Sequence, residues 1–351
     1  MSVSIPKQIP SISQVNKAGD ILRSETSTPE QISQAMKTLS LWRQAHGPAL
    51  NTFQAMLRGR CKSQGFTDEN STVAQRMKRL PSIIGKLCRK KTRLSKMQDI
   101  AGLRVILPTV PDVRAFHEDM LKSPAKHEPI VPADDYINRP KKDGYRSLHQ
   151  VFRYRNPSHP ELDAIHVEVQ IRTQLQHAWA TAVETIGVLE HSSFKSGDGS
   201  SEFKRFFKLS SALISNEEKS PILEELQDIP IPVLIEEFVE LERRLKIFEK
   251  LRSVTIAAKH VSGMTGDYTL MLLDTANNSV SLTPFDAEQS SWAEDVYSSM
   301  EERYRGDETK FLVLVSVSDL TSLKKAYPNY FLSTTQFINT LQKICNSSKR
   351  S

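Results

Sequence analysis

The sequence predicts an α/β protein of the α+β type, because stretches with helical periodicity alternate with short apolar strands. Apolar residues recur at helical spacing across residues 29–64. An apolar run over 102–107 ends at Pro108, and residues 147–154 and 164–172 each alternate apolar with polar side chains. The first pattern is typical of amphipathic helices and the other two of strands. At 351 residues, the chain has room for about two domains.

The first two hundred residues predict one long series of elements. Residues 1–28, rich in Ser, Pro and Gln, are expected to be partly ordered. Pro48 divides 29–64 into two helices, and a basic helix over 73–98 is started or interrupted by Pro81. The elements expected next are a strand at 102–107, a helix at 111–121, a turn-rich loop to 143, paired strands at 147–154 and 164–172, a helix at 173–190 and a polar, glycine-rich mobile loop at 191–201.

The second part of the chain predicts helices followed by a small unit of strands and helices. Helices are expected over 203–219 and 231–258, and the pattern changes after Gly263. The elements expected from there are strands at 267–274 and 279–285 around the Asn277-Asn278 turn, a helix at 287–304, a strand at 310–317 and helices at 319–326 and 333–346. This ββαβα-like order predicts a domain at 29–200, a helical connector at 201–262 and a C-terminal domain at 263–351.

The net charge of +6 is unevenly distributed. Residues 51–150 carry 20 Lys and Arg against 10 Asp and Glu, whereas residues 151–351 carry 22 against 28. A basic segment of this kind indicates a polyanionic partner. The three cysteines show no CxxC spacing, which argues against a disulfide scaffold or a cysteine zinc site. Without a signal peptide or a membrane-length apolar run, we expect a cytoplasmic protein that makes no membrane contact.

A series of basic residues is the first candidate for chemistry. Lys78, Ser82, Lys86 and Arg89 follow one another at steps of four, four and three, with Arg76 just before them. These steps would place the series on one face of a helix. Cations with a hydroxyl group suit a bound triphosphate. By spacing alone, a solvated basic face is the more common alternative.

Two carboxylates on separate strands are the second candidate. Asp99 precedes the strand that contains Arg104. Glu168 lies on a later strand, and Gln170 and Arg172 follow it on the same face. Polar residues at alternating positions are also typical of the solvent face of a sheet. Two such carboxylates can instead converge on one Mg²⁺, an arrangement suited to phosphoryl transfer.

An aromatic ring among cations is the third candidate, in residues 135–149. Such a ring can stack a nucleic-acid base, which contributes about 1–3 kcal/mol per base. The alternative is a Gly-Tyr turn with a tyrosine in the core. The residues concerned are Lys141, Lys142, Tyr145, Arg146 and His149.

In this order, the motifs resemble the RelA/SpoT synthetase family. They are R-x-K-xxx-S-xxx-K, D-I-x-G-x-R-V, P-K-x-x-G-Y-x-S-L-H and E-V-Q-I-R-T-xxx-H-x-W-A, within residues 76–180. The resemblance implies a mixed β-sheet flanked by helices, related to nucleotidyltransferase folds. It also implies a pyrophosphokinase that moves the β,γ-pyrophosphate of ATP onto a ribose 3′-hydroxyl and releases AMP.

The resemblance also assigns roles to residues. Arg76 and Arg104 would sandwich the adenine of ATP. Asp99 and Glu168 would bind Mg²⁺, and Glu168 would also accept the proton of the attacking hydroxyl. The triphosphate would be held by Lys78, Ser82, Lys86 and Arg89. Tyr145 would stack the acceptor base as a third catalytic residue, in a pocket with Lys141, Lys142, Arg146, His149 and Arg172. Asp143 stands where the family often has Asn.

Two further segments resemble CapRel-type fused toxin–antitoxin proteins: WRQAHGPALNTFQAMLR at 42–58 and KKAYPNYF at 324–331. In that group, the synthetase is a toxin that pyrophosphorylates the 3′ CCA end of tRNA and blocks translation. A C-terminal pseudo-zinc-finger domain inhibits it until a phage capsid protein is sensed. The resemblance implies that Tyr327 and Tyr330 cover the ATP pocket; the alternative is that they form a packed turn.

Three functions therefore remain open. The resemblance favours a tRNA pyrophosphokinase toxin with an intramolecular C-terminal inhibitor, released by a phage protein. An alarmone synthetase that uses ATP with GDP or GTP would need the same motifs with a smaller acceptor. A catalytically silent nucleotide-binding sensor would need no intact carboxylates.

Overall fold

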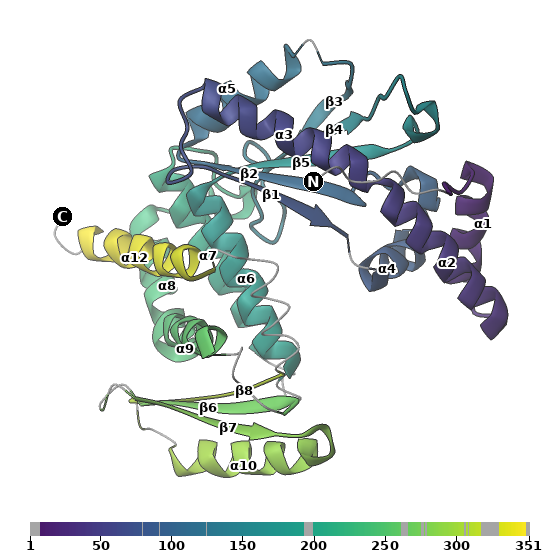
Figure 1. The fold of residues 1–351 in the computed structure, drawn as a ribbon. Coiled ribbons are helices and arrows are strands. Elements are labelled where there is room, and N and C mark those ends of the chain that lie inside the picture. Colours follow the sequence, from purple (N-terminus) through teal and green to yellow (C-terminus); the bar gives the residue numbers. More distant parts are fainter. Residues whose placement is uncertain are drawn as a thin grey trace. The chain divides into compact units, whose positions relative to one another are not determined.

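The computed structural model describes most of the chain. The described residues are 8–78, 80–90, 92–123, 125–192, 199–260, 266–274, 277, 279–304, 307, 309–316 and 330–348. Contacts divide the chain into two compact units (Figure 1). The first, here called the sheet unit, comprises Met1–Ile137 and Ser147–Thr173. The second, here called the helical unit, comprises Asn138–Arg146 and Gln174–Ser351.

The sheet unit is built on a five-stranded sheet with the order β1-β2-β5-β4-β3. The strands are β1 (Thr72–Met77), β2 (Ala101–Leu107), β3 (Glu128–Asp135), β4 (Leu148–Arg153) and β5 (His166–Thr173). Strands β2 and β5 are parallel and the other neighbours are antiparallel. The predicted mixed sheet of an α+β fold is therefore confirmed. The helices of this unit are α1 (Ile12–Arg23), α2 (Pro29–Ala45), α3 (Gly47–Ser63), α4 (Leu80–Lys90) and α5 (Val110–Leu121), with short turns η1 (Leu94–Lys96) and η2 (Pro160–Leu162).

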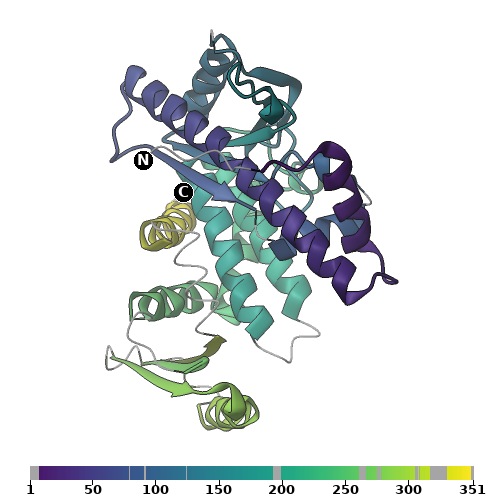
Figure 2. The same ribbon diagram turned by 45° about the vertical axis from the view of Figure 1, so that its right-hand side comes forward.

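One face of this sheet forms the core of the unit. Helices α3 and α5 pack against it, and α3 runs across the strands in both views (Figures 1 and 2). Leu103 and Val169, which pair across β2 and β5, are buried in one apolar cluster with Phe53 of α3. The Phe53 ring lies 4.7 Å from the His127 ring and 5.3 Å from the Phe152 ring. Because side chains alternate along a strand, the opposite face is left for polar residues.

Two strands lie where other structure was predicted. Residues 72–77 form β1 instead of the start of a helix, because they pair with β2 along their whole length. That pairing satisfies the backbone groups on the side that faces β2 and outweighs a weak helical preference. Residues 128–135 form β3 instead of a loop. Pro129 and Pro132 argue against a strand when the sequence is considered alone. Proline is tolerated in β3 because this strand is at the edge of the sheet.

Residues 1–28 were predicted to be partly ordered, and within this segment the structure describes a helix at Ile12–Arg23. Helix α1 begins after Ser11, whose hydroxyl accepts a hydrogen bond from the Gln14 amide at 3.3 Å. The Gln14 side chain accepts one in turn from the Ser11 amide at 2.8 Å. This capping box is a sequence signal for a helix start. Val15 and Ala18 on α1 are buried.

The helical unit packs its helices around a cluster of aromatic rings. Its helices are α6 (Gln174–Ser192), α7 (Gly199–Glu217), α8 (Ile231–Leu245), α9 (Ile247–His260), α10 (Ser290–Arg303) and α12 (Tyr330–Ser348), with short turns η3 (Glu224–Leu226) and η5 (Ala287–Gln289). The cluster includes Phe206 and Phe207 of α7 and Phe337 of α12. A three-stranded antiparallel sheet has the order β7-β6-β8, with β6 (Tyr268–Asp274), β7 (Ser279–Phe285) and β8 (Lys310–Ser316).

The helical unit differs from the predicted division at residues 200 and 262. Met271 of β6 and Phe337 of α12 share the apolar core of α6–α9. Leu270, Phe285, Ala293 and Leu314 form a separate apolar cluster between the small sheet and α10. The predicted helix at 231–258 is two helices, because Lys246 adopts φ +52° and ends α8. No glycine marks this break. The predicted helix at 319–326 lies outside the described residues, as does most of the predicted loop at 191–201.

Within the described parts of the chain, no helix has the length and apolar character needed to cross a membrane.

We predict that Phe53→Ala lowers the free energy of unfolding by about 3–5 kcal/mol, because it removes a fully buried ring and leaves a cavity. Urea unfolding followed by circular dichroism measures the change. Arg58→Ala on the exposed side of α3 is the matched control, and we expect it to change stability by about 0.5 kcal/mol or less. Equal effects of the two substitutions would contradict this packing of α3.

Candidate active site

A small pocket lies on the polar face of the five-stranded sheet, over β1, β2 and β5. Its volume is about 60 Å³, and its lining residues are Arg76, Lys78, Asp99, Gly102, Leu103, Arg104, Glu168 and Gln170. Five of these eight residues were assigned a role in the sequence analysis, and Gln170 was noted there on the same strand face as Glu168. The structure therefore brings the nucleotide-binding and carboxylate motifs of the sequence to one place.

The strand register explains why these residues meet. Arg76 on β1 pairs with Gly102 on β2, and Gly102 pairs with Glu168 on β5. Paired residues project from the same face of a sheet. Because Gly102 has no side chain, it leaves the space between Arg76 and Glu168 open. A Cβ at Gly102 would lie 3.3 Å from the Arg76 carbonyl oxygen, which is close. Arg104 lies two residues further along β2, on the same face.

Asp99 is held between two lysines at the start of β2. Its Oδ2 accepts hydrogen bonds from Lys78 Nζ at 3.0 Å and from Lys86 Nζ at 2.8 Å. Its Oδ1 is buried and accepts no hydrogen bond from the residues that the structure describes. Burial opposes ionisation of Asp99, but the two lysines outweigh it and hold its pKa below the ordinary value. Asp99 is therefore an anion with one oxygen still available to a ligand.

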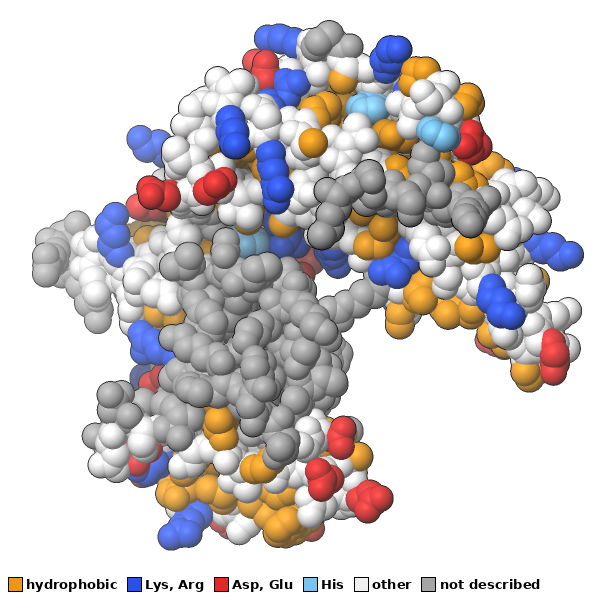
Figure 3. Space-filling view, viewed as in Figure 1, with side chains coloured by type: hydrophobic (Ala, Val, Ile, Leu, Met, Phe, Trp, Pro, Cys, Tyr) orange, Lys and Arg blue, Asp and Glu red, His pale blue; other side chains and the backbone are white. Residues whose placement is uncertain are grey.

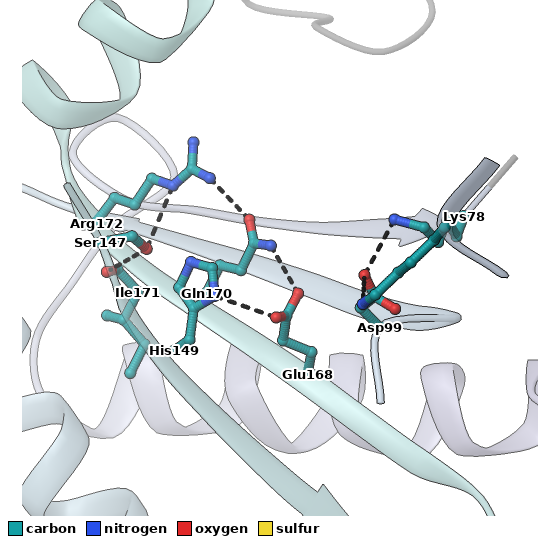
Figure 4. A network of polar contacts seen from close by, with 9 residues as sticks. Lys78, Asp99, Ser147, His149, Glu168, Gln170, Ile171 and Arg172 are labelled. Carbon is teal, nitrogen blue, oxygen red and sulfur yellow. Dashed lines mark hydrogen bonds and ion pairs between the residues drawn. The ribbon is translucent and has the colours of Figure 1, made fainter. Parts of the chain in front are cut away.

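Glu168 is held at both oxygens by its neighbours on the sheet (Figure 4). Its Oε1 lies 3.1 Å from His149 Nδ1, and its Oε2 accepts a hydrogen bond from Gln170 Nε2 at 2.7 Å. Burial raises the pKa of Glu168. The hydrogen bond and the charge of the His149 ring, together with the hydrogen bond from the Gln170 amide, lower it by more, so the pKa lies below the ordinary value. The nearby charge of Asp99 acts in the opposite direction.

The chain of contacts continues from Gln170 into the sheet (Figure 4). Gln170 Oε1 accepts a hydrogen bond from Arg172 Nη2 at 2.8 Å, and Arg172 Nε donates to Ser147 Oγ at 3.4 Å. Ser147 Oγ donates to the Ile171 carbonyl at 3.2 Å. Arg172 was predicted to line the acceptor pocket, and here it is buried and orients Gln170. Gln170 and Ser147 were not among the predicted site residues, although the Gln-x-Arg spacing after Glu168 was a readable signal.

The predicted basic helical face is divided between three segments. Arg76 lies on β1, Lys78 follows that strand, and the other members lie on α4. The prediction that one helix carries Lys78 with Ser82, Lys86 and Arg89 is wrong, because pairing with β2 draws the segment before Lys78 into the sheet. Ser82 and Arg89 are exposed on α4.

The predicted acceptor-binding residues fall in both units. His149 and Arg172 belong to the sheet unit, whereas Lys141, Lys142, Tyr145 and Arg146 belong to the helical unit. Lys141 and Lys142 are exposed, and Lys141 Nζ lies 4.8 Å from the centre of the Tyr145 ring. Arg146 is only 3% exposed and packs against α7. Tyr327 and the side chain of Tyr330 lie outside the described residues.

We predict that Gln170→Leu raises the pKa of Glu168, because it removes a hydrogen bond that favours the ionised carboxylate. A carbon-13 NMR titration of the carboxyl groups measures this pKa. A lowered native pKa stabilises the fold above the unfolded-state pKa, and this stabilisation is lost as the pH falls through the native value. In the variant this stabilisation should therefore be smaller, and its loss should be complete at a higher pH.

Gln75→Leu is the matched control, since Gln75 lies on β1 and its side chain bonds Asn51 and Gln54 instead. An unchanged Glu168 pKa in Gln170→Leu would show that Gln170 does not hold the carboxylate.

Comparison with known proteins finds relatives of part of this chain. The family model described as "Region found in RelA / SpoT proteins" matches residues 75–198. The chain is 34% identical over 139 residues to the GTP pyrophosphokinase YjbM and 33% identical over 118 residues to the GTP pyrophosphokinase YwaC, both of Bacillus subtilis. These matches cover 38% and 30% of this chain, and 65% and 52% of the two relatives.

A solved structure is also similar: the small alarmone synthetase 1 of Bacillus subtilis bound to its product pppGpp. It is 27% identical with a TM-score of 0.42, over 51% of this chain and 94% of that one. The pocket residues Arg76 to Gln170 all fall within the segment that the family model matches. Residues 75–198 of this chain are thus similar to the region described for RelA and SpoT proteins.

Proposed function

We propose that this chain is a pyrophosphokinase that transfers the β,γ-pyrophosphate of ATP to a ribose 3′-hydroxyl. The observation that carries the proposal is the pocket where Lys78, Asp99 and Glu168 meet, with Lys86 of α4 bound to the same Asp99 oxygen as Lys78. Phosphoryl transfer depends mainly on positioning and on cations that stabilise charge on phosphate oxygens. A pocket lined by two ionised carboxylates, one lysine and two arginines, with a second lysine bound to Asp99, meets that need.

The proposed reaction forms one bond and breaks one. The acceptor 3′-oxygen attacks the β-phosphorus of ATP and loses its proton to Glu168. The bond between the β-phosphorus and the α,β-bridging oxygen breaks, and AMP leaves with that oxygen. Glu168 is ionised at neutral pH and so can accept the proton, although its lowered pKa makes it a weak base. His149 and Gln170 hold both its oxygens in place.

The cations have separate proposed tasks. Arg76 and Arg104 lie on the same face on adjacent strands, and planar guanidinium groups stack well on a base. Lys78 and Lys86 each contact Asp99 through one ammonium group, which carries three donors, so each can also bind phosphate oxygens. Ser82 and Arg89 on α4 are proposed to extend this contact along the triphosphate.

Mg²⁺ fits the residues present. Asp99 Oδ1 is a buried carboxylate oxygen to which no described residue donates, and Glu168 is the second carboxylate of the pocket. Among the described residues no group of three or more His, Cys, Asp and Glu side chains is arranged to hold a metal alone. Mg²⁺ typically uses one or two carboxylates together with substrate phosphates. Asp99 and Glu168 would hold the ion, which when bound neutralises charge on the phosphates.

For the acceptor, we propose the 3′ CCA end of tRNA, with GDP or GTP as the alternative. Exposed cations on the sheet unit that the pocket does not use support a polyanion, namely Arg58, Lys62, Lys90 and Arg93. Lys and Arg side chains are spread over the face in view and do not form one patch (Figure 3). The names of the relatives, GTP pyrophosphokinases, support the alternative.

We predict that ATP labelled at the γ-phosphate transfers its label to deacylated tRNA, and that Glu168→Gln reduces the rate at least about 10³-fold by removing the base and a metal ligand. Parallel reactions with GDP and GTP identify the acceptor by chromatography of the labelled product. The matched control is Glu161→Gln, an exposed carboxylate of the sheet unit. Label on guanine nucleotides alone would replace tRNA by the alarmone alternative, and no transfer to any acceptor would favour a silent sensor.

We further propose that residues 263–351 inhibit the enzyme through Tyr327 and Tyr330, and that a phage capsid protein relieves this inhibition. The support is the resemblance of residues 324–331 to the CapRel-type inhibitory segment. Aromatic rings can occupy a pocket built to stack adenine. Release requires a partner that binds the open state more tightly than the inhibited one.

We predict that the double substitution Tyr327→Ala and Tyr330→Ala makes the full-length protein toxic to the cell that expresses it, without a phage. Growth and protein synthesis after induction measure the effect. Tyr304→Ala is the matched control, since Tyr304 follows α10 in the same C-terminal stretch. The full chain is required because Phe337 completes the core of the helical unit. Unchanged growth with the double variant would place the inhibition elsewhere.

A further inference from the structure

Tyr145 is carried by a tight turn in the helical unit. The Lys141 amide donates to the Tyr145 carbonyl at 3.1 Å, and the Gly144 amide donates back to the Lys141 carbonyl at 2.8 Å. Asp143 Oδ1 accepts a hydrogen bond from the Tyr145 amide at 3.0 Å. These bonds shape the turn from within. They do not by themselves tie the turn to any helix.

A hydroxyl on α7 connects this turn to the helix. Ser211 Oγ donates to the Gly144 carbonyl at 2.7 Å and accepts from Arg146 Nε at 3.2 Å. A serine hydroxyl has one proton and two lone pairs, so both bonds can exist at once. Ser211 is 1% exposed, which makes each bond important because water cannot replace it. The residues on either side of Tyr145 are therefore held by the same atom.

The fit around Gly144 leaves little room for the turn to shift. Gly144 has φ +94°, a conformation that residues with a Cβ rarely adopt. An added Cβ would lie 3.0 Å from Ser211 Cβ and 3.1 Å from Trp179 Cζ2. Trp179 is itself fixed, because its Nε1 donates to the Phe207 carbonyl at 2.9 Å. The turn thus rests on two helices, α6 and α7.

Arg146 extends the connection to the turn that follows α7. Its Nη1 donates to Ser220 Oγ at 3.2 Å, and its Nη2 donates to the Pro221 carbonyl. Burial lowers the pKa of Arg146 to about 10, and the charge of Glu218 acts against this. The side chain is therefore still a cation at neutral pH. Its guanidinium is directed into the helical unit and not toward solvent.

We propose that Ser211 and Arg146 are positioning residues that fix Tyr145 for its acceptor. The inference rests on the proposed role of Tyr145 in stacking the acceptor base. It assigns a function to α7 and the following turn, which lie beyond the segment 75–198 that the family model matches. It also replaces the expected acceptor contact of Arg146 by contacts with Ser211, Ser220 and Pro221.

If Ser211 had a purely structural role, its substitution would affect stability alone. The test therefore needs a control variant that removes a similar buried hydroxyl elsewhere on α7. Ser215 provides it, because it is equally buried and its Oγ donates to the Ser211 carbonyl at 2.7 Å without touching the turn. Ser211→Ala and Ser215→Ala each remove one buried hydroxyl from the same helix. Their thermal unfolding midpoints are compared first. Ser220→Ala, at a half-buried turn, is a third variant that removes one partner of Arg146.

The first readout needs no catalytic activity. Trypsin cleaves after Lys141 and Lys142, both exposed, but only when the tight turn opens locally. We expect trypsin to cut Ser211→Ala at these sites about tenfold faster than the native chain, which equals about 1.4 kcal/mol of lost turn stability. Ser220→Ala should be cut about threefold faster, which equals about 0.65 kcal/mol. Ser215→Ala should be cut at the native rate. Equal cleavage of Ser211→Ala and Ser215→Ala would overturn the inference.

The second readout compares the change in KM for the acceptor with the change in KM for ATP. The acceptors used are deacylated tRNA and GDP. We expect Ser211→Ala to raise the acceptor KM about tenfold and to leave the KM for ATP within about twofold, since the turn is proposed to bind only the acceptor. Equal changes in both KM values would overturn the inference. Transfer by the native chain and Ser215→Ala establishes the proposed function separately. If neither transfers, that function fails and the trypsin comparison alone decides whether Ser211 holds the turn.

Discussion

The parallel pairing of β2 with β5 is the interaction on which the site depends. Its register places Gly102 opposite Glu168 and Arg104 opposite Gln170. Shifting this register by one residue would move every one of these side chains to the other face of the sheet. The apolar partners on the opposite face, such as Leu103 and Val169, are buried under α3, so such a shift would expose the core. Packing on one face thereby determines the chemistry on the other.

The site concentrates charge in a place where unpaired charge is costly. Asp99 and Glu168 are both partly buried, and each is stabilised as an anion by neighbours that donate hydrogen bonds. A buried carboxylate without such partners would be neutral at neutral pH. Lys78, Lys86, His149 and Gln170 thus keep both carboxylates ionised and oriented. Arg172 supports this arrangement by donating a hydrogen bond to Gln170.

Much of the fold could be predicted from the sequence, and the exceptions have physical causes. The apolar strands β2 and β5 and the carboxylates at Asp99 and Glu168 were predictable, because burial imposes a clear pattern on a central strand. The edge strands β1 and β3 were not, since an exposed edge imposes no such pattern and tolerates proline. The break at Lys246 was also hidden, because a lysine in the left-handed conformation carries no local signal.

The site could be predicted less completely than the fold. Charged residues within a motif were found, but the partners that hold them were not, since Gln170 and Ser147 act through contacts with Arg172 that only the sheet creates. The same limit explains Arg146, whose charge indicated a ligand, whereas the structure surrounds it with α7 and the turn at Ser220 and Pro221. The presence of a Lys or Arg in a sequence does not show whether its side chain faces solvent or is buried.

The central claim is that the polar face of the sheet transfers pyrophosphate, and the nucleotide released from ATP tests it most directly. ATP is labelled at the β-phosphate in one sample and at the γ-phosphate in another, and deacylated tRNA, GDP or GTP is the acceptor. The account predicts that both labels are transferred to the product to the same extent and that AMP is released in equal amount. Release of ADP with transfer of the γ-label alone, or intact ATP with every acceptor, would contradict it.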